Sequence, residues 1–157
     1  PYTTLFRSVI GDDANLIRKF PKMQGRIFDV AISRDGTMIV AASSYNGTGA
    51  VSLYAYDFDS KLPDNIAAIV VKVSYVRSAA EKAELEKYRQ SGVKLLASME
   101  EQKGGVYTVT FSPDGKVVAS GGFDGVVRLN DAKTGKFIKK FVPVDVQKPQ
   151  VATAGEK

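Results

Sequence analysis

The chain has 157 residues, of which 44% are hydrophobic and 25% are charged, a composition typical of a globular chain. It has no cysteine and no histidine. Their absence excludes a disulfide, a thiolate or imidazole metal site and a Ser-His-Asp triad within this chain. No apolar run approaches the roughly 20 residues that cross a bilayer, so no membrane span is expected.

The net charge is +5, and much of the positive excess falls late in the sequence. Five lysines carry it: Lys133, Lys136, Lys139, Lys140 and Lys148. Such a cluster can bind nucleic acid. However, no aromatic residues interleave with these lysines as stacking platforms would. We therefore favour a solvated outer strand and expect no nucleic-acid partner.

Residues 1–8 resemble the translation of a common short-read sequencing adapter. They are left out of the fold interpretation, as a fusion scar would be, and the chain is expected to begin inside a domain. Within residues 9–24, the run Leu16–Phe20 is similar to the later run Phe137–Phe141. It is therefore expected to be the last strand of a preceding sheet, after a turn at Gly11–Asp13.

Two segments, 25–36 and 104–115, align at a constant offset of 79 positions (35 to 114, 36 to 115). Each begins with a short, mostly apolar run rich in β-branched residues, which is typical of a buried strand. Each ends in an Asp-Gly pair, which favours a tight hairpin turn. The predicted turn residues are Asp35, Gly36, Asp114 and Gly115.

The first copy continues into a longer unit than the second. Its third strand is expected at Ala50–Tyr56, after a wide loop at Tyr45–Gly49, and its fourth at Val93–Met99. Residues 57–92 then form an insertion between these two strands. Subtracting the 36 inserted residues from the offset leaves 43 (79 − 36), close to the roughly 40–45 residues of a four-stranded repeat unit.

The insertion contains one clear helix signal, because Ser78–Glu81 has the sequence of a capping box and Gly92 suits the position after a helix. The earlier stretch 63–73 is ambiguous. Pro63 suits a first helical turn, whereas the β-branched run Ile69–Val71 favours a strand. We favour a helix, which makes the insertion a small helical hairpin.

Three more strands follow the second copy, at Lys116–Ser120, Val126–Asn130 and Lys136–Val142. Together with the strand that opens the copy, they predict a four-stranded meander. The glycine-rich segment Gly121–Gly125 joins two strands rather than a strand and a helix. It is therefore not expected to cradle a phosphate.

Phe111–Gly115 followed by Ala119–Asp131 resembles the WD repeat in the order strand, turn, strand, turn, strand. This resemblance implies an all-β fold: a partial β-propeller of four-stranded antiparallel meander blades with a small helical insertion. Propeller blades bury their faces against one another, so the remaining blades of the same chain are expected to be neighbours of these two.

The sequence departs from the WD pattern at two dipeptides, since the family's Trp-Asp is Asn130-Asp131 and its Gly-His is Glu101-Gln102. In the family, an Asp, a His, a Ser or Thr and the Trp form a buried hydrogen-bonded set. Only Asp124 and Ser120 match that set, so we expect it to be broken. Asp124 is expected to cap its own turn through the Gly125 amide.

The resemblance divides the chain as follows. Residues 9–24 are the outer strand of a preceding, truncated blade. Residues 25–103 form a blade with the insertion at 57–92, and residues 104–142 form a second blade. Residues 143–157 are a linker or tail, because prolines and small polar residues dominate them.

Three segments, Gly11–Arg18, Tyr88–Arg89 and Phe141–Val144, also resemble WD-repeat segments of planctomycete-type multidomain bacterial proteins. Those proteins often carry a c-type haem domain, so the resemblance implies an exported protein and otherwise leaves the localisation open. No Cys-x-x-Cys-His motif occurs in this chain, and no cofactor is expected in this segment.

Two functions remain. The first is a scaffold that binds a protein partner through loops held by the strands. Its candidate surface joins the wide loop to the insertion: Tyr45, Asn46, Lys82, Glu86 and Arg89. The alternative for these residues is a tolerated insertion without a partner. The second function is the scaffold part of a larger redox or hydrolytic multidomain enzyme. No catalytic or metal-binding residues are expected in this segment, because it has no nucleophile with a base and no metal constellation.

Overall fold

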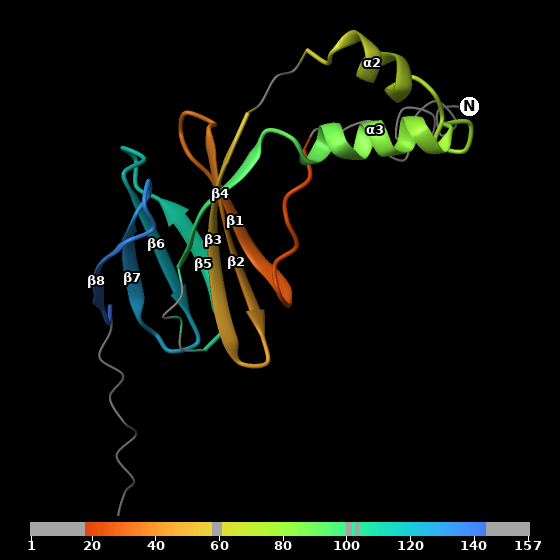
Figure 1. Ribbon diagram of the computed structural model, residues 1–157. Helices are drawn as coiled ribbons and strands as arrows, with labels where there is room; N and C mark the ends of the chain where they lie inside the picture. The colour runs from red at the N-terminus through yellow and green to blue at the C-terminus, as the bar shows by residue number, and fades with distance from the viewer. Residues whose placement is uncertain (1–17, 58–60, 100–101, 103, 144–157) are drawn as a thin grey trace, which may run out of the picture.

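The computed structural model describes residues 18–57, 61–99, 102 and 104–143 (Figure 1). These residues form two four-stranded antiparallel sheets, and each sheet follows the order of the chain. The strands of the first sheet are β1 (Arg26–Ile32), β2 (Met38–Tyr45), β3 (Thr48–Tyr56) and β4 (Val93–Met99). Those of the second sheet are β5 (Val106–Phe111), β6 (Val117–Gly122), β7 (Val127–Asp131) and β8 (Phe137–Phe141). The predicted fold class of four-stranded antiparallel meanders is confirmed.

Burial alternates along the two central strands of the second sheet, β6 and β7. In β6, Val118 and Ser120 are buried, whereas Val117 and Ala119 are partly exposed. The register pairs Ser120 with Arg128 of β7, so the buried face continues from strand to strand. One face of this sheet therefore packs against the first sheet, and the other face stays half-exposed.

The main core lies between the two sheets. Val40 and Leu53 of the first sheet and Val106 and Val118 of the second are at most 1% exposed and belong to one cluster. Full burial of an aliphatic side chain stabilises a fold by about 1.5–3 kcal/mol. These contacts hold the two sheets together face to face.

Two helices lie between β3 and β4 and extend beyond one end of the first sheet (Figure 1). They are α2 (Asp64–Val70) and α3 (Ala79–Gln90), and we call this hairpin the arm. It has a small core of its own, formed by Ile66, Ile69 and Leu85. The helical insertion predicted with the fold class is confirmed.

The start of α3 is fixed by its sequence. Ser78 Oγ accepts a hydrogen bond from the Glu81 amide at 3.2 Å, and Glu81 Oε2 accepts one from the Ser78 amide at 2.8 Å. This is the predicted capping box. In the ambiguous stretch 63–73, residues 64–70 are helical, as favoured.

Residues 18–24 lie against the arm and the first sheet without forming a strand. The Lys19 amide donates a hydrogen bond to the Arg89 carbonyl at 2.9 Å, and the ring of Phe20 lies edge-on to Tyr54 at 5.3 Å. Of the outer strand predicted over residues 9–24, the described part, residues 18–24, is not a strand. Residues 9–17 and the adapter-like residues 1–8 lie outside the described residues.

Of the predicted tail, 143–157, only Pro143 is described. Among the described residues, no helix has the length and apolar character that a bilayer crossing needs.

Candidate functional site

The predicted turn residues form two matching turns. Asp35 Oδ1 accepts hydrogen bonds from Ser33 Oγ at 2.6 Å and from the Thr37 amide at 3.1 Å. Gly36 has φ +72°, in the left-handed region that favours glycine. The second turn repeats this arrangement at Ser112, Asp114, Gly115 and Lys116. The serine hydroxyls, followed by the amides, lower the pKa of both carboxyls, so these aspartates stabilise turns.

The two sheets are also joined by a carboxylate at their inner strands. Asp29 Oδ2 of β1 accepts hydrogen bonds from Thr108 Oγ1 at 2.9 Å and from the Val109 amide of β5 at 3.0 Å. The Val109 amide is the main cause of the lowered pKa of Asp29. Beside it, the rings of Phe28 and Tyr107, at equivalent bulges in β1 and β5, lie 5.1 Å apart. We call this contact the inner latch.

Asp124 closes its turn differently from the prediction. Its Oδ1 accepts from the Val126 amide at 3.1 Å, whereas the Gly125 amide donates to the Gly122 carbonyl at 3.1 Å. Gly125 adopts φ +68°, in the left-handed region. In this conformation its amide donates to the Gly122 carbonyl rather than to the Asp124 carboxylate. The other oxygen of Asp124 pairs with the Arg128 guanidinium, which is the main cause of the lowered pKa of this carboxyl.

The buried hydroxyl of Ser120 has a partner that the sequence analysis missed. Gln102 Nε2 donates to Ser120 Oγ at 3.4 Å, and both side chains are at least nine-tenths buried. Gln102 stands where the WD pattern has its histidine. The expected break in the buried polar set is therefore partial, because a glutamine amide replaces one of the missing contacts.

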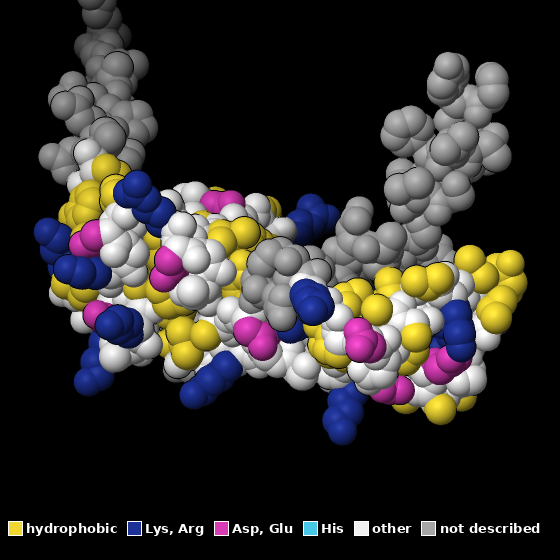
Figure 2. Space-filling view, turned by 90° about the horizontal axis from the view of Figure 1, so that it is seen from above, with side chains coloured by type: hydrophobic (Ala, Val, Ile, Leu, Met, Phe, Trp, Pro, Cys, Tyr) yellow, Lys and Arg dark blue, Asp and Glu magenta, His cyan; other side chains and the backbone are white. Residues whose placement is uncertain are grey.

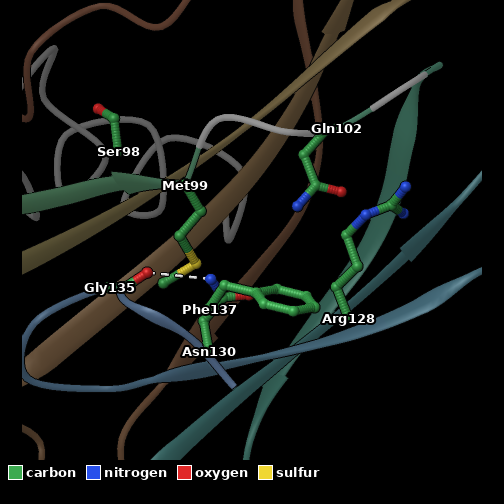
Figure 3. Close-up of a pocket in the computed structure, with 7 residues that line it drawn as sticks. All are labelled: Ser98, Met99, Gln102, Arg128, Asn130, Gly135 and Phe137. Atoms are coloured by element: carbon green, nitrogen blue, oxygen red, sulfur yellow. Dashed lines mark hydrogen bonds between the residues drawn. The ribbon is translucent and has the colours of Figure 1, made fainter. Parts of the chain in front are cut away.

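A hollow of about 180 Å³ lies beside Gln102, between β4 of the first sheet and β7–β8 of the second. Figure 3 shows Met99, Gln102 and Arg128 gathered around Asn130 and Phe137. Asn130 Nδ2 donates to the Gly135 carbonyl at 2.9 Å. Asn130 Oδ1 is buried and has no hydrogen-bond partner among the described residues.

Comparison with known families identifies the repeat. The model of the family described as "WD domain, G-beta repeat" matches residues 93–131. This match begins at the first residue of β4 and ends at the last residue of β7. The chain therefore carries a WD repeat. Its two sheets are blades of a partial β-propeller, and the matched repeat runs from the outer strand of one blade into three strands of the next.

A solved structure supports the same fold. The crystal structure of Saccharomyces cerevisiae Sqt1 is similar to this chain with a TM-score of 0.50 and 11% sequence identity. The similarity covers 80% of this chain and 25% of that one, so this chain spans about a quarter of the length of the structure it matches. No curated protein sequence matches the chain.

The candidate interaction residues fall at opposite ends of the first blade. Tyr45 ends β2 and is half-exposed, and Asn46 follows it in the β2–β3 turn. Lys82, Glu86 and Arg89 lie on α3, which follows the far end of β3 (Figure 1). The nine residues of β3 separate the two groups by about 30 Å, since a strand rises roughly 3.3 Å per residue. The loop and the arm thus do not form one surface.

Two of the three candidate residues on α3 are engaged by other parts of this chain rather than free for a partner. Glu86 accepts a hydrogen bond from Lys19 Nζ at 2.5 Å, and Lys19 is the main cause of the lowered pKa of Glu86. Arg89 is buried. Lys82 is exposed. Sequence spacing placed these residues on the helix but did not reveal which face residues 18–20 cover.

The loop between the two helices exposes an apolar group that the sequence analysis did not select. Its members, which we call the apolar tip, are Val71, Val73, Tyr75 and Val76, and they are 86%, 52%, 86% and 60% exposed. Hydrophobic side chains gather at the end of the arm that lies farthest from the blades (Figure 2). The signal in the sequence was the run of valines after the last helical turn of α2.

Arg77 holds the loop behind the apolar tip. Its buried guanidinium donates hydrogen bonds to the carbonyls of Ile69, Val70 and Lys72, at 3.1, 3.2 and 2.9 Å. Lys72 forms an ion pair with Glu81, which lowers the pKa of that carboxyl to about 2. The apolar side chains therefore project from a backbone that is fixed at several points.

Proposed function

We propose that this segment is a binding scaffold for a protein partner and that the arm carries its binding surface. The observation that carries the proposal is the apolar tip, whose four side chains are more than half exposed. An exposed group of apolar side chains is a feature of interaction sites. The WD repeat supports the same class of function, because such repeats generally mediate contacts between proteins.

The geometry of the arm favours tight contact at low entropic cost. The loop is already fixed by the three hydrogen bonds of Arg77, so binding need not order it. Tyr75 offers a large contact area with few rotatable bonds, as aromatic anchors at interfaces do. A partner with an apolar groove would bury these side chains.

The carboxylates of the blades support a structural role for this segment rather than a catalytic one. Asp29 joins the blades, Asp35 and Asp114 hold turns, and Asp124 pairs with Arg128. Each has a lowered pKa with a local cause. Such groups are poor general acids or bases near neutral pH. We therefore propose no chemical step for this segment.

A deletion tests the arm directly. The Asp57 amide donates to the Gly92 carbonyl at 2.9 Å, so the ends of the insertion are adjacent. A short Gly-Ser turn in place of residues 58–91 should leave the first blade intact. Affinity capture with the full-length protein should recover a partner that this deletion loses. Capture of the same partners by both forms would overturn the proposal.

A point variant separates the apolar tip from the rest of the arm. The double substitution Val71→Ser and Tyr75→Ser should reduce partner capture at least tenfold, because both side chains are 86% exposed and support no core. Lys82→Ser, on the exposed side of α3, is the matched control and should capture normally. Equal loss in both variants would mean that the tip is not the contact.

A further inference from the structure

The second blade places polar side chains where the first blade is apolar or small. The 79-residue offset matches Ala41 with Ser120, and the strand registers then match the following β-strand positions. In the first blade these positions hold Ala41, Ser52 and Tyr54, and in the second they hold Ser120, Arg128 and Asn130. All three polar side chains of the second blade are more than nine-tenths buried. Buried polar groups are costly without partners, so this difference between sister blades needs a cause.

The hollow is a consequence of this difference. In the first blade, the 4%-exposed ring of Tyr54 fills the position, and the ring of Phe20 packs against it at 5.3 Å. In the second blade, the shorter Asn130 leaves about 180 Å³ between β4 and β7–β8. A site needs about 10–15 Å³ of such space to hold one water molecule, so the hollow is large enough to admit a small organic group.

The side chains around the hollow define what it can hold. Asn130 Nδ2 is held by the Gly135 carbonyl, which fixes the side chain with its unpartnered Oδ1 turned away from that bond. This oxygen needs a donor. Among the described residues, Gln102 Nε2 makes only a long contact of 3.4 Å, to Ser120 Oγ, and it can donate to a better acceptor. Arg128 is neutralised by Asp124, so the hollow has no net charge to offer an ion.

We propose that this hollow binds a neutral carboxamide group. The N–H of the carboxamide donates to Asn130 Oδ1, its carbonyl accepts from Gln102 Nε2, and its short apolar stem lies against Met99 and Phe137 (Figure 3). A primary carboxamide supplies N–H donors and a carbonyl acceptor without charge, which matches this lining. The group belongs either to a free small amide or to a glutamine or asparagine side chain of a partner. This site is separate from the arm and does not rest on the function proposed for it.

A titration of the full chain with propionamide tests the site. The side-chain amide resonances of Asn130 and Gln102 in a ¹H–¹⁵N spectrum should shift saturably. Two matched probes should not shift them: N,N-dimethylpropionamide, which has no N–H donor, and propionate, which carries a charge. Equal shifts with the dimethyl compound, or shifts that do not saturate, would overturn the proposal and leave a hollow that holds only water.

A variant tests the same site from the side of the protein. Asn130→Tyr restores the residue of the first blade and should fill the hollow, so the Gln102 resonance should no longer respond to propionamide. This variant is expected to unfold at the same temperature or higher, which keeps the result interpretable. Asn130→Leu has similar size and lacks the acceptor, and it should also abolish the response. A Gln102 resonance that still shifts in both variants would contradict the proposed site.

Short peptides distinguish the two sources of the group. A pentapeptide with a central glutamine is compared with matched glutamate and alanine peptides. Binding of the glutamine peptide at least tenfold tighter than propionamide would assign the group to a partner's side chain. Equal affinities would assign it to a free amide. Binding of all three peptides with equal affinity would overturn recognition of the carboxamide.

Discussion

Replacing Asp29 with alanine should weaken the junction between the two blades. The substitution removes the hydrogen bonds from Thr108 Oγ1 and the Val109 amide. Val109 is 3% exposed, so its amide would lose its acceptor in a place that water reaches poorly. A buried donor without a partner costs about 1–3 kcal/mol, and the more exposed threonine hydroxyl adds about 0.5 kcal/mol. We expect a total loss of about 1.5–3.5 kcal/mol.

Urea unfolding measures this loss, and two further variants divide it. Asp29→Asn keeps an acceptor without the charge and should lose about half as much. Thr108→Val removes one hydrogen bond and leaves the Val109 amide satisfied, so it should lose about 0.5–1 kcal/mol. A double-mutant cycle between Asp29 and Thr108 should give a coupling energy above zero.

The pH dependence provides an independent check. The pKa of Asp29 is lowered in the folded chain, mainly by the Val109 amide. The unfolded chain therefore binds the proton more tightly, and the contribution to stability is present above the ordinary aspartate pKa of about 3.9. It is lost as the pH falls through the lower, folded-state pKa. The difference in stability between the wild type and Asp29→Asn should shrink below about pH 4. A loss under 0.5 kcal/mol for Asp29→Ala, or a pH-independent difference, would refute the latch.

Three further predictions follow from particular contacts. Gly122→Ala should destabilise the chain by about 3 kcal/mol in urea unfolding, because the added Cβ would lie 2.0 Å from the Gly105 carbonyl oxygen. In the control Gly121→Ala, the added Cβ meets nothing closer than 3.6 Å, so this variant should be neutral. Equal destabilisation by the two substitutions would contradict this prediction. Ser78→Ala should speed amide exchange in α3 about fivefold, for a loss of about 1 kcal/mol, and leave the strands unchanged. Leu129 lies on the half-exposed face of the second blade, through which we expect copies of the chain to associate, so Leu129→Glu should reduce the association measured by sedimentation. The control Lys82→Glu should not.

Sequence patterns predicted the parts of this fold that depend on neighbours along the chain. The Asp-Gly turns, the alternating strands and the capping box at Ser78 are local, and each appears where the sequence placed it. The WD resemblance is confirmed for the same reason, since the turns and strands of residues 93–131 carry it.

The missed features depend on contacts between distant residues. The inner latch needs two bulges to bring Asp29 to Val109, and no local pattern in the sequence predicts that meeting. Burial of Arg89 depends on contacts that its helical spacing does not reveal. The hollow could be predicted only by comparing Asn130 with Tyr54 at the matching position of the first blade, because the sequence of one blade does not indicate that an aromatic ring is missing from it.

The apolar tip shows a different limit. The β-branched run Ile69–Val71 left the stretch 63–73 ambiguous between a strand and the helix that we favoured. In the folded chain, Val71 and Val73 follow the end of α2 and project from a loop held by Arg77. The composition of the segment was informative, but its exposure could be known only from the placement of the arm beyond the blades.

Amide hydrogen exchange along the whole chain tests whether the two blades form one packed unit that carries the arm as a separate element. The slowest amides of β2 and β6 should open with the same free energy, and Asp29→Ala should lower both free energies equally. The amides of α3 should open more readily and respond to Ser78→Ala but not to Asp29→Ala. Independent opening of β2 and β6, with Asp29→Ala affecting neither, would show that the two blades are not one packed unit.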